Sequence, residues 1–178
     1  MASYLTSNVK LHWGGAAFSV DLADELAGPF TLTGAVSVPR RRVQGQSGVT
    51  ADGVAAGLSA AGVFYASDTL DTLIANLDGF LAVEQTDSAR VLVIPMLVVS
   101  VGLAAPAANA LTRAVRFVQS DNGGVVEGAR STSNLTLSSG EEGYLITSSA
   151  ITRSTSGTVT VGASQIGVKG TPITAEAA

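Results

Sequence analysis

The feature that most constrains the fold is a stretch without any charged residue, residues 91–112, which lies between Arg90 and Arg113. About 20 apolar residues suffice for a membrane-spanning helix, so the length alone permits a span. The composition indicates a strand instead, because prolines and a glycine interrupt the stretch and β-branched residues dominate its first half. Nearly continuous apolar strands are typically buried on both faces or packed against another subunit. We therefore predict a buried strand over residues 90–101 and no membrane span.

The composition also indicates that another molecule covers part of the protein surface. Hydrophobic residues make up 46% of the 178 residues and charged residues only 13%, whereas soluble domains usually carry about 25% charged residues. A membrane and other protein subunits are the two candidate covers. Residues 1–15 lack the apolar core of a signal peptide, so secretion by that route is not expected. The length predicts one domain, residues 1–170, followed by a short tail, residues 171–178.

Several classes of chemistry are excluded or unsupported. The chain has no cysteine, which excludes disulfides, thiolate metal sites and cysteine nucleophiles. Its 10 basic and 14 acidic residues leave no broad basic face, so tight nucleic-acid binding is not expected. The single histidine, His12, has no candidate partner nearby in sequence and is interpreted as structural. No hydrolase, Walker-loop or metal-binding motif is present, and we predict no catalytic, cofactor-binding or metal-binding residue and no cofactor.

The periodicity of the sequence predicts a mainly β fold. Only residues 67–79 show a helical period, with apolar side chains at i, i+3, i+4 and i+7: Leu70, Leu73, Ile74 and Leu77. Gly79 can close this short helix in the left-handed conformation. Most other segments resemble strands, chiefly by alternating apolar and polar residues, namely residues 30–38, 58–65, 111–119, 134–137, 143–153 and 158–161. Ser and Thr fill 15 of the 30 residues from 131 to 160, and the apolar residues between them favour strands over disorder. We expect a β-sandwich or partly closed barrel with one short helix.

Residues 39–53 differ in kind from the rest of the chain. They are rich in glycine and polar residues, which predicts a long loop or hairpin standing off the fold. Loops of this length inside compact domains are usually functional or disordered. The loop holds the only basic cluster, and we take its first residues as candidate contacts to another subunit: Arg40, Arg41, Arg42, Val43 and Gln44. The alternatives are an exposed loop tip or a contact to phosphate, which three charges would make weak and sensitive to salt.

The acidic residues gather in the first half of the chain. Residues 1–89 carry 4 basic and 9 acidic residues, and residues 90–178 carry 6 and 5. A basic loop on one copy can pair with acidic residues of the next copy, and such head-to-tail pairing builds open stacks. The candidates for that role are Asp68, Asp71, Asp78, Glu84 and Asp87. Capping and solvation of the predicted helix explain the three aspartates equally well.

The order of these features resembles the siphophage major tail proteins, which are also called tail tube proteins. The features are a strand pair joined by a long glycine-rich hairpin (residues 36–54), the run G-L-S-A-A-G-V-F-Y-A-S-D-T-L-D-T-L (residues 57–73) leading into one helix, and the following strand R-V-L-V-I-P-M. The resemblance covers roughly residues 9–128 and rests on architecture and pattern. The serine- and threonine-rich remainder fits only as extra strands or an outer decoration.

The resemblance implies a structural virion protein that forms hexameric rings, which stack into the tube that the genome passes through. Its partners would be further copies of itself and other tail proteins. DNA would pass without tight binding along a neutral to acidic wall, and the candidate acidic residues above are also candidates for that wall. The protein would be made in the host cytoplasm and reside in the phage tail. The alternatives are a capsid decoration or other virion protein, an enzyme acting through Asp or Ser, and a membrane-anchored protein.

Overall fold

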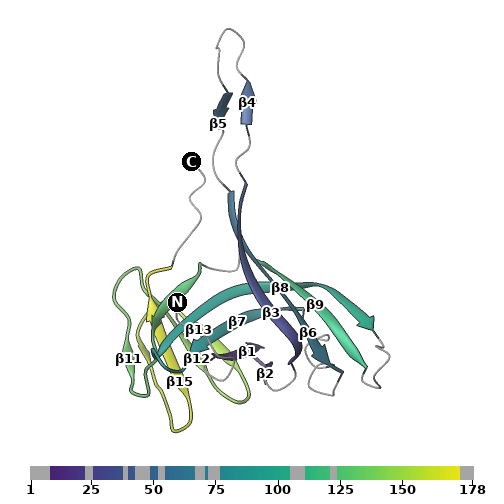
Figure 1. Ribbon diagram of the computed structural model, residues 1–178. Coiled ribbons are helices and arrows are strands. Elements are labelled where there is room, and N and C mark those ends of the chain that lie inside the picture. The colour runs from purple at the N-terminus through teal and green to yellow at the C-terminus, as the bar shows by residue number, and fades with distance from the viewer. Residues whose placement is uncertain are drawn as a thin grey trace.

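In the residues that the structure describes, the chain consists mostly of antiparallel β-strands (Figure 1). The computed structural model describes residues 9–22, 26–37, 40–42, 49–51, 55–66, 71, 77–104, 111–120 and 124–172. Within these ranges the strands are β1 (Val9–Gly15), β2 (Phe18–Asp21), β3 (Leu26–Ser37), β4 (Arg40–Arg42), β5 (Val49–Ala51), β6 (Ala55–Tyr65), β7 (Asp78–Gln85), β8 (Arg90–Ala104), β9 (Thr112–Gln119), β10 (Val126–Ala129), β11 (Leu135–Thr136), β12 (Glu142–Ile146), β13 (Ile151–Ser154), β14 (Thr158–Val159) and β15 (Ile166–Gly170). The mainly β fold predicted from the sequence is confirmed.

One large sheet forms the body of the molecule. Its strands follow the order β2-β1-β7-β8-β9-β6-β3, and β10 pairs with the first part of β8. Strand β8 lies in the middle of this order and pairs with β7 on one side and with β9 and β10 on the other. A central position explains why its sequence is nearly continuously apolar. The predicted buried strand over residues 90–101 is confirmed and extends to Ala104.

The large sheet curls around a hydrophobic core. The rings of Trp13 in β1 and Phe117 in β9 lie 5.0 Å apart between centroids, although β7 and β8 separate the two strands in the sheet. Side chains from most strands of the sheet fill the concave side, with Trp13, Phe64, Leu81 and Ile94 fully buried among them. In the described part of the chain the two terminal strands, β2 and β3, do not pair with each other. The curl therefore stays open along both edges.

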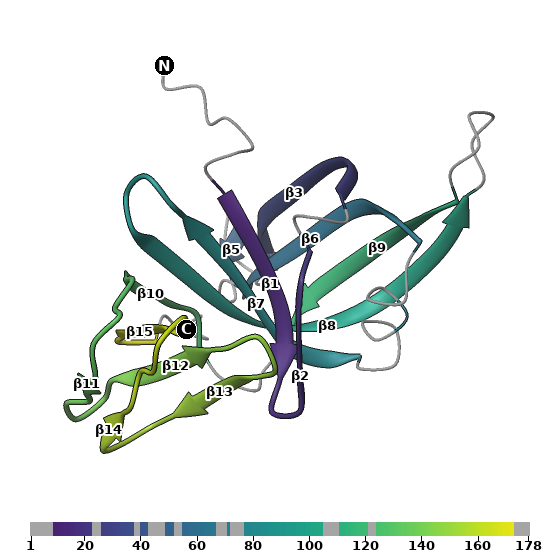
Figure 2. The same ribbon diagram turned by 90° about the horizontal axis from the view of Figure 1, so that it is seen from below.

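A smaller sheet covers part of the convex side. Its strands follow the order β13-β12-β15 and pack on β7, β8 and β10 (Figure 2). The ring of Tyr144 in β12 meets that of Phe80 in β7 edge-on, with centroids 5.1 Å apart. Tyr144 is fully buried, and this burial raises the pKa of its phenol to about 12. The serine- and threonine-rich segment is thus an ordered layer, because its apolar residues face the large sheet.

Two details differ from the sequence-based expectations. Asp78 and Gly79, predicted as the end of a helix, begin strand β7. A Cβ at Gly79 would lie 2.6 Å from the carbonyl oxygen of Gly14, so this glycine permits a close approach of β1 and does not cap a helix. Within residues 67–76 only Asp71 is described, with helical backbone, and the rest of the predicted helix lies outside the described residues.

The predicted strand over residues 143–153 is the second difference, because it is two strands, β12 and β13. The N–H of Thr147 donates to the carbonyl oxygen of Ala150 across the turn between them. The Thr147 hydroxyl also accepts from the N–H groups of Ser149 and Ala150, which makes a turn stabilised by its own side chain.

No helix in the described ranges combines the length and apolarity that crossing a bilayer requires.

Candidate functional site

The predicted hairpin projects from the body of the molecule (Figure 1). Strands β4 and β5 pair antiparallel, with Arg40 opposite Ala51 and Arg42 opposite Val49, and among the described strands they pair only with each other. The hairpin continues strands β3 and β6 beyond the ends of the neighbouring strands. Val43 and Gln44, and the side chains of the three arginines, lie outside what the structure describes. The prediction that these five residues contact another subunit stays a prediction.

The candidate acidic residues do not come together in one patch. Asp71 is exposed and its Oδ1 lies 3.2 Å from Nη2 of Arg113. Asp78 is exposed at the start of β7, and Asp87 is exposed in the turn that follows the same strand. Asp68 lies outside the described residues. Within a single chain these carboxylates are therefore spread over different sides of the sheet.

Glu84, the fifth candidate, is fully buried. Its Oε1 accepts a hydrogen bond of 2.7 Å from Nη1 of Arg130, and its Oε2 lies 3.6 Å from Nε2 of His12. The negative charge of Glu84 is therefore balanced by Arg130 within the same chain, and the buried carboxylate does not face a partner or a channel. His12, interpreted from the sequence as structural, contributes to this buried cluster. Because Arg130 lies 46 residues from Glu84, no local signal in the sequence reveals the pair.

The free edge of β3 is a second candidate surface. Strand β3 spans 12 residues, pairs with β6 on one side and ends the sheet on the other. Its sequence, LAGPFTLTGAVS, contains no charged residue. Natural proteins usually protect long edge strands with charges, bulges or covering segments, because bare edges pair with other chains. In β3 such protection is confined to the start, where the pairing with β6 is irregular between Leu26 and Phe30 and where Pro29 lies. From Phe30 to Ser37 the edge is regular, uncharged and without a partner in the described part of the chain, which suits it to pairing with a strand of another subunit.

Large apolar side chains are exposed close to the ends of strands β6 and β8 and the starts of β7 and β9. The exposed fractions reach 63% at Leu103 and 54% at Leu77, and Tyr65 and Leu111 are also exposed. The N–H of Ala66 donates to the carbonyl oxygen of Leu111, which joins the end of β6 to the start of β9. The register places Tyr65 and Leu103 on opposite faces of the sheet, so these side chains are separate exposed apolar positions near the ends of strands.

The described residues offer little for chemistry. They contain no group of three or more potential metal ligands of the His, Cys, Asp and Glu types. A shallow hollow of about 240 Å³ is lined by Leu32, Val83 and Leu92 together with Arg90 and Glu127. The two charged residues pair with each other at 3.0 Å. The candidate interaction surfaces are therefore the hairpin, the β3 edge and the exposed apolar side chains near the strand ends.

Comparisons with known proteins find similarity in structure only. No protein-family model matches the sequence, and no curated protein matches it significantly. A chain in the tail of an empty GTA particle, determined with C6 symmetry, matches with a TM-score of 0.51 and 8% identity, covering 69% of this chain and 97% of that chain. At this identity the match shows likeness of fold.

Two further solved structures show weaker similarity. A chain of the virion of a native gene transfer agent (GTA) particle has a TM-score of 0.49 and 10% identity, covering 69% of this chain and 97% of that one. The SPP1 Dit protein, described as a hub of the adsorption apparatus in phages that infect Gram-positive hosts, has a TM-score of 0.45 and 10% identity. That match covers 90% of this chain and 78% of Dit.

Proposed function

We propose that this chain is a structural subunit of a phage-like tail, and that its copies form stacked rings that make the wall of a tail tube. The observation that carries the proposal is the likeness of its fold to a chain in the C6-symmetric tail of a GTA particle. The match covers nearly all of that chain, so the similarity extends over the whole tail subunit and not over a single motif. The order of strands, hairpin and predicted helix in the sequence, which resembles that of siphophage major tail proteins, supports the same proposal.

Sideways association uses the free edges of the large sheet. The uncharged edge of β3 pairs with a strand of the next subunit, so that the curled sheets of neighbours continue one another around a ring. Ring closure satisfies the backbone groups of every edge, which an isolated subunit leaves to water. Exposed Leu103 and Leu111, near the end of β8 and the start of β9, become buried between subunits, as is usual for obligate interfaces.

Stacking uses the hairpin. Because β4 and β5 lie beyond the end of the sheet, they reach a neighbour that is displaced along the strands of β3 and β6 (Figure 1). Arg40, Arg41 and Arg42 on this hairpin dock on acidic residues of the adjacent ring, for which exposed Asp78 and Asp87 are the candidates. A ring interface and a separate stacking contact together build a tube. The protein would then be located in the virion tail.

Sedimentation velocity of the purified chain over a range of concentrations tests the proposal. We expect oligomers of one ring size and larger stacks, and a variant carrying Thr31→Lys and Thr33→Lys should sediment as a monomer because charges on an edge strand oppose pairing. Thr155→Lys, at an exposed position of the small-sheet segment, is the matched control and should assemble normally. A wild-type chain that stays monomeric at high concentration contradicts the proposal.

A further inference from the structure

One broad face of the large sheet has no cover in the described part of the chain. The register places the side chains of Thr31, Ala61 and Arg116 side by side across β3, β6 and β9, and Ser100 of β8 lies next to Arg116. Two residues further along β3, Thr33 lies opposite Ser59 on the same face. We call this surface, on the convex side of β3, β6, β9 and the last part of β8, the open face.

The other sheet surfaces are filled. The concave side holds the core around Trp13 and Phe117, so it cannot line a channel. On the convex side, the β13-β12-β15 sheet covers β7, β10 and the first part of β8. The open face therefore remains as the wide surface where sheet backbone and small side chains are exposed. Small hydroxyl and methyl groups cover most of it, as exposed Thr31, Thr33 and Ser100 illustrate, and alternation along β6 places exposed Tyr65 at its border.

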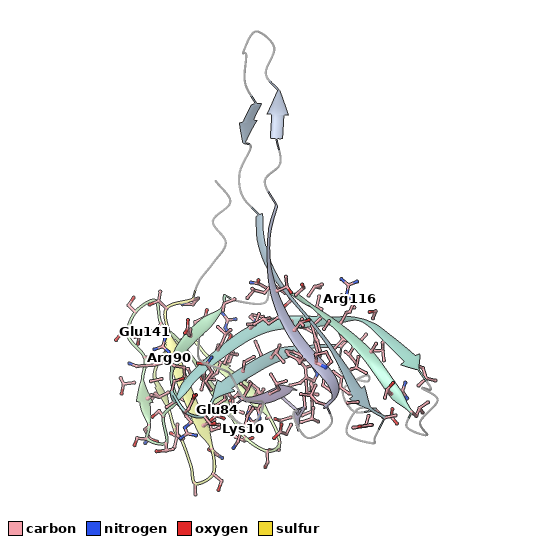
Figure 3. The ribbon with its side chains drawn as sticks, viewed as in Figure 1. Lys10, Glu84, Arg90, Arg116 and Glu141 are labelled. Atoms are coloured by element: carbon pink, nitrogen blue, oxygen red, sulfur yellow. The ribbon has the colours of Figure 1, made fainter. Side chains whose placement is uncertain are left out.

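The open face carries a single charge. Arg116 is exposed and lies on the outer side of the arch formed by β8 and β9 (Figure 3). The other arginine of β9, Arg113, points to the opposite face and pairs with Asp71. No Asp or Glu lies on β3, β6, β9 or the last part of β8, and Asp78 of β7 borders the face next to Leu97. The face is thus neutral apart from one guanidinium group.

We infer that the open face lines the passage of the tube and that Arg116 contacts the phosphates of the DNA that moves through it. This inference rests on the proposed function, since it needs a ring. A neutral wall of small side chains does not hold DNA, and one arginine in each subunit neutralises few phosphates, so the contact is weak and sensitive to salt. The sequence-based expectation placed acidic residues on this wall. The open face differs, because Glu84 is buried and Asp71 lies on the concave side.

Accessibility of single cysteines in assembled tubes tests which face lines the passage, since the natural chain has none. Ser100→Cys reports on the open face at a position away from the β3 edge, and Ser156→Cys reports on an exposed turn of the small-sheet segment. In tubes many rings long, we expect the first variant to react with a small maleimide but not with one attached to a large polyethylene glycol chain. The second variant should react with both reagents, and dissociated subunits of both variants should react with both.

The possible results test the inference about the open face and the proposed function separately. Tubes in which Ser100→Cys reacts with the large reagent have the open face outside, and tubes in which it reacts with neither reagent have that face buried between subunits. Either result overturns the inference and leaves the proposed function standing. A chain that forms no rings at all contradicts the proposed function, and the inference falls with it.

Co-sedimentation of short duplex DNA with assembled tubes at low salt tests the role of Arg116. We expect Arg116→Gln to lower the bound fraction several-fold and the remaining binding to lose much of its salt dependence. Arg90→Gln is the matched control, because Arg90 is exposed but lies off the open face. Equal binding by both variants means that Arg116 does not contact DNA.

Discussion

Arg130 makes an ion pair with Glu84 that joins the end of β10 to β7 across the large sheet. It follows β10, and its guanidinium meets Glu84 of β7 at 2.7 Å, with the glutamate side chain fully buried. A buried carboxylate costs free energy unless it is paired and hydrogen-bonded, so removal of one partner is far more damaging than replacement of both. The sequence identified Glu84 only as one acid among several. Its burial could not be predicted, because the pairing partner lies far away along the chain.

We predict that Arg130→Met lowers the free energy of unfolding by about 3 kcal/mol, since it leaves the buried carboxylate without its hydrogen-bonded partner. Urea unfolding measures the change. The double variant Glu84→Gln with Arg130→Met should recover part of the loss, because a neutral amide is easier to bury than a charge. A loss below about 0.5 kcal/mol for the single variant would be typical of a surface pair and would contradict this account.

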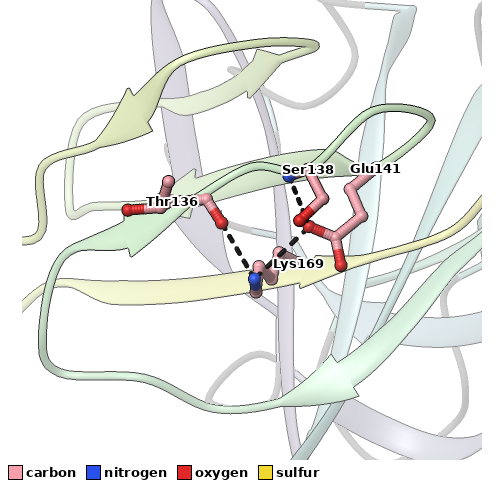
Figure 4. Close-up of polar contacts among 4 residues, drawn as sticks. All are labelled: Thr136, Ser138, Glu141 and Lys169. Carbon is pink, nitrogen blue, oxygen red and sulfur yellow. Dashed lines mark hydrogen bonds and ion pairs between the residues drawn. The ribbon is translucent and has the colours of Figure 1, made fainter.

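Glu141 illustrates a polar contact at the surface of the small sheet (Figure 4). The backbone N–H of Ser138 donates to its Oε2 at 2.7 Å, and Nζ of Lys169 lies 3.3 Å from the same oxygen. The hydrogen bond from Ser138, with a smaller contribution from Lys169, lowers the pKa of the Glu141 carboxyl below its ordinary value of 4.5. Lys169 also donates to the carbonyl oxygen of Thr136, so these contacts join β15 to β11 and to the turn before β12.

The lowered pKa means that the folded state favours the carboxylate form of Glu141. Its stabilising effect is therefore present above pH 4.5 and is lost as the pH falls through the depressed folded value. We predict that the wild-type chain melts at a higher temperature than Glu141→Gln at neutral pH, and that the difference vanishes in acid. Thermal unfolding followed by circular dichroism at several pH values tests this. A difference that persists unchanged in strong acid would contradict it.

At the scale of secondary-structure elements, long strands with a clear pattern could be predicted from the sequence. The uncharged stretch predicted β8, and the alternation in residues 111–119 predicted β9 within one residue. The helical period predicted a helix that ends at Gly79, which is wrong at that end, because Gly79 lies in β7 and allows β1 to pack closely against it. Strand β1 was not predicted, although Val9, Leu11 and Trp13 alternate. Glycine has a low intrinsic propensity for β-strands, so the end of β1 does not resemble a strand in sequence. Hydrogen bonding to β7 stabilises the extended backbone there.

We predict that Val93→Pro prevents folding. Val93 lies in β8 with Ala82 of β7 on one side and Val126 of β10 on the other, and it is fully buried. Proline removes a backbone donor from a strand that has partners on both sides. Soluble yield and circular dichroism measure the effect, and Val93→Ala, which only removes two methyl groups, should still fold. Tolerance of the proline would mean that β8 is not a central strand.

The hairpin was predicted from the sequence and β4 and β5 pair as expected, whereas its role in stacking stays a prediction. The triple variant Arg40→Glu, Arg41→Glu and Arg42→Glu should leave rings intact but stop them from stacking, because the hairpin then repels the acidic surface that it meets. Counting rings and stacks in negative-stain micrographs measures this. Replacement of the same residues by lysine keeps the charge and should restore most stacking. Tubes of normal length from the glutamate variant would exclude the arginines as the stacking contact.

At the scale of the whole molecule, the low charge content agrees with the proposed assembly into rings. The sequence predicts a covered surface, and the fold offers candidate locations for it: the uncharged β3 edge, exposed apolar side chains at the strand ends and an open face with one charge. Which sheet face is free could not be predicted, because it depends on the curl of the sheet and on where the β13-β12-β15 sheet packs. Both arise from contacts between residues that are distant in sequence.

The most direct test of the central claim is a helical reconstruction by cryo-electron microscopy of the particles that the purified chain forms. The account predicts stacked rings with the sheets of neighbouring subunits continuous through the β3 edge, the hairpin contacting the adjacent ring and Arg116 facing the axis. Closed rings that lack any contact through β3, or particles that never stack, would contradict it.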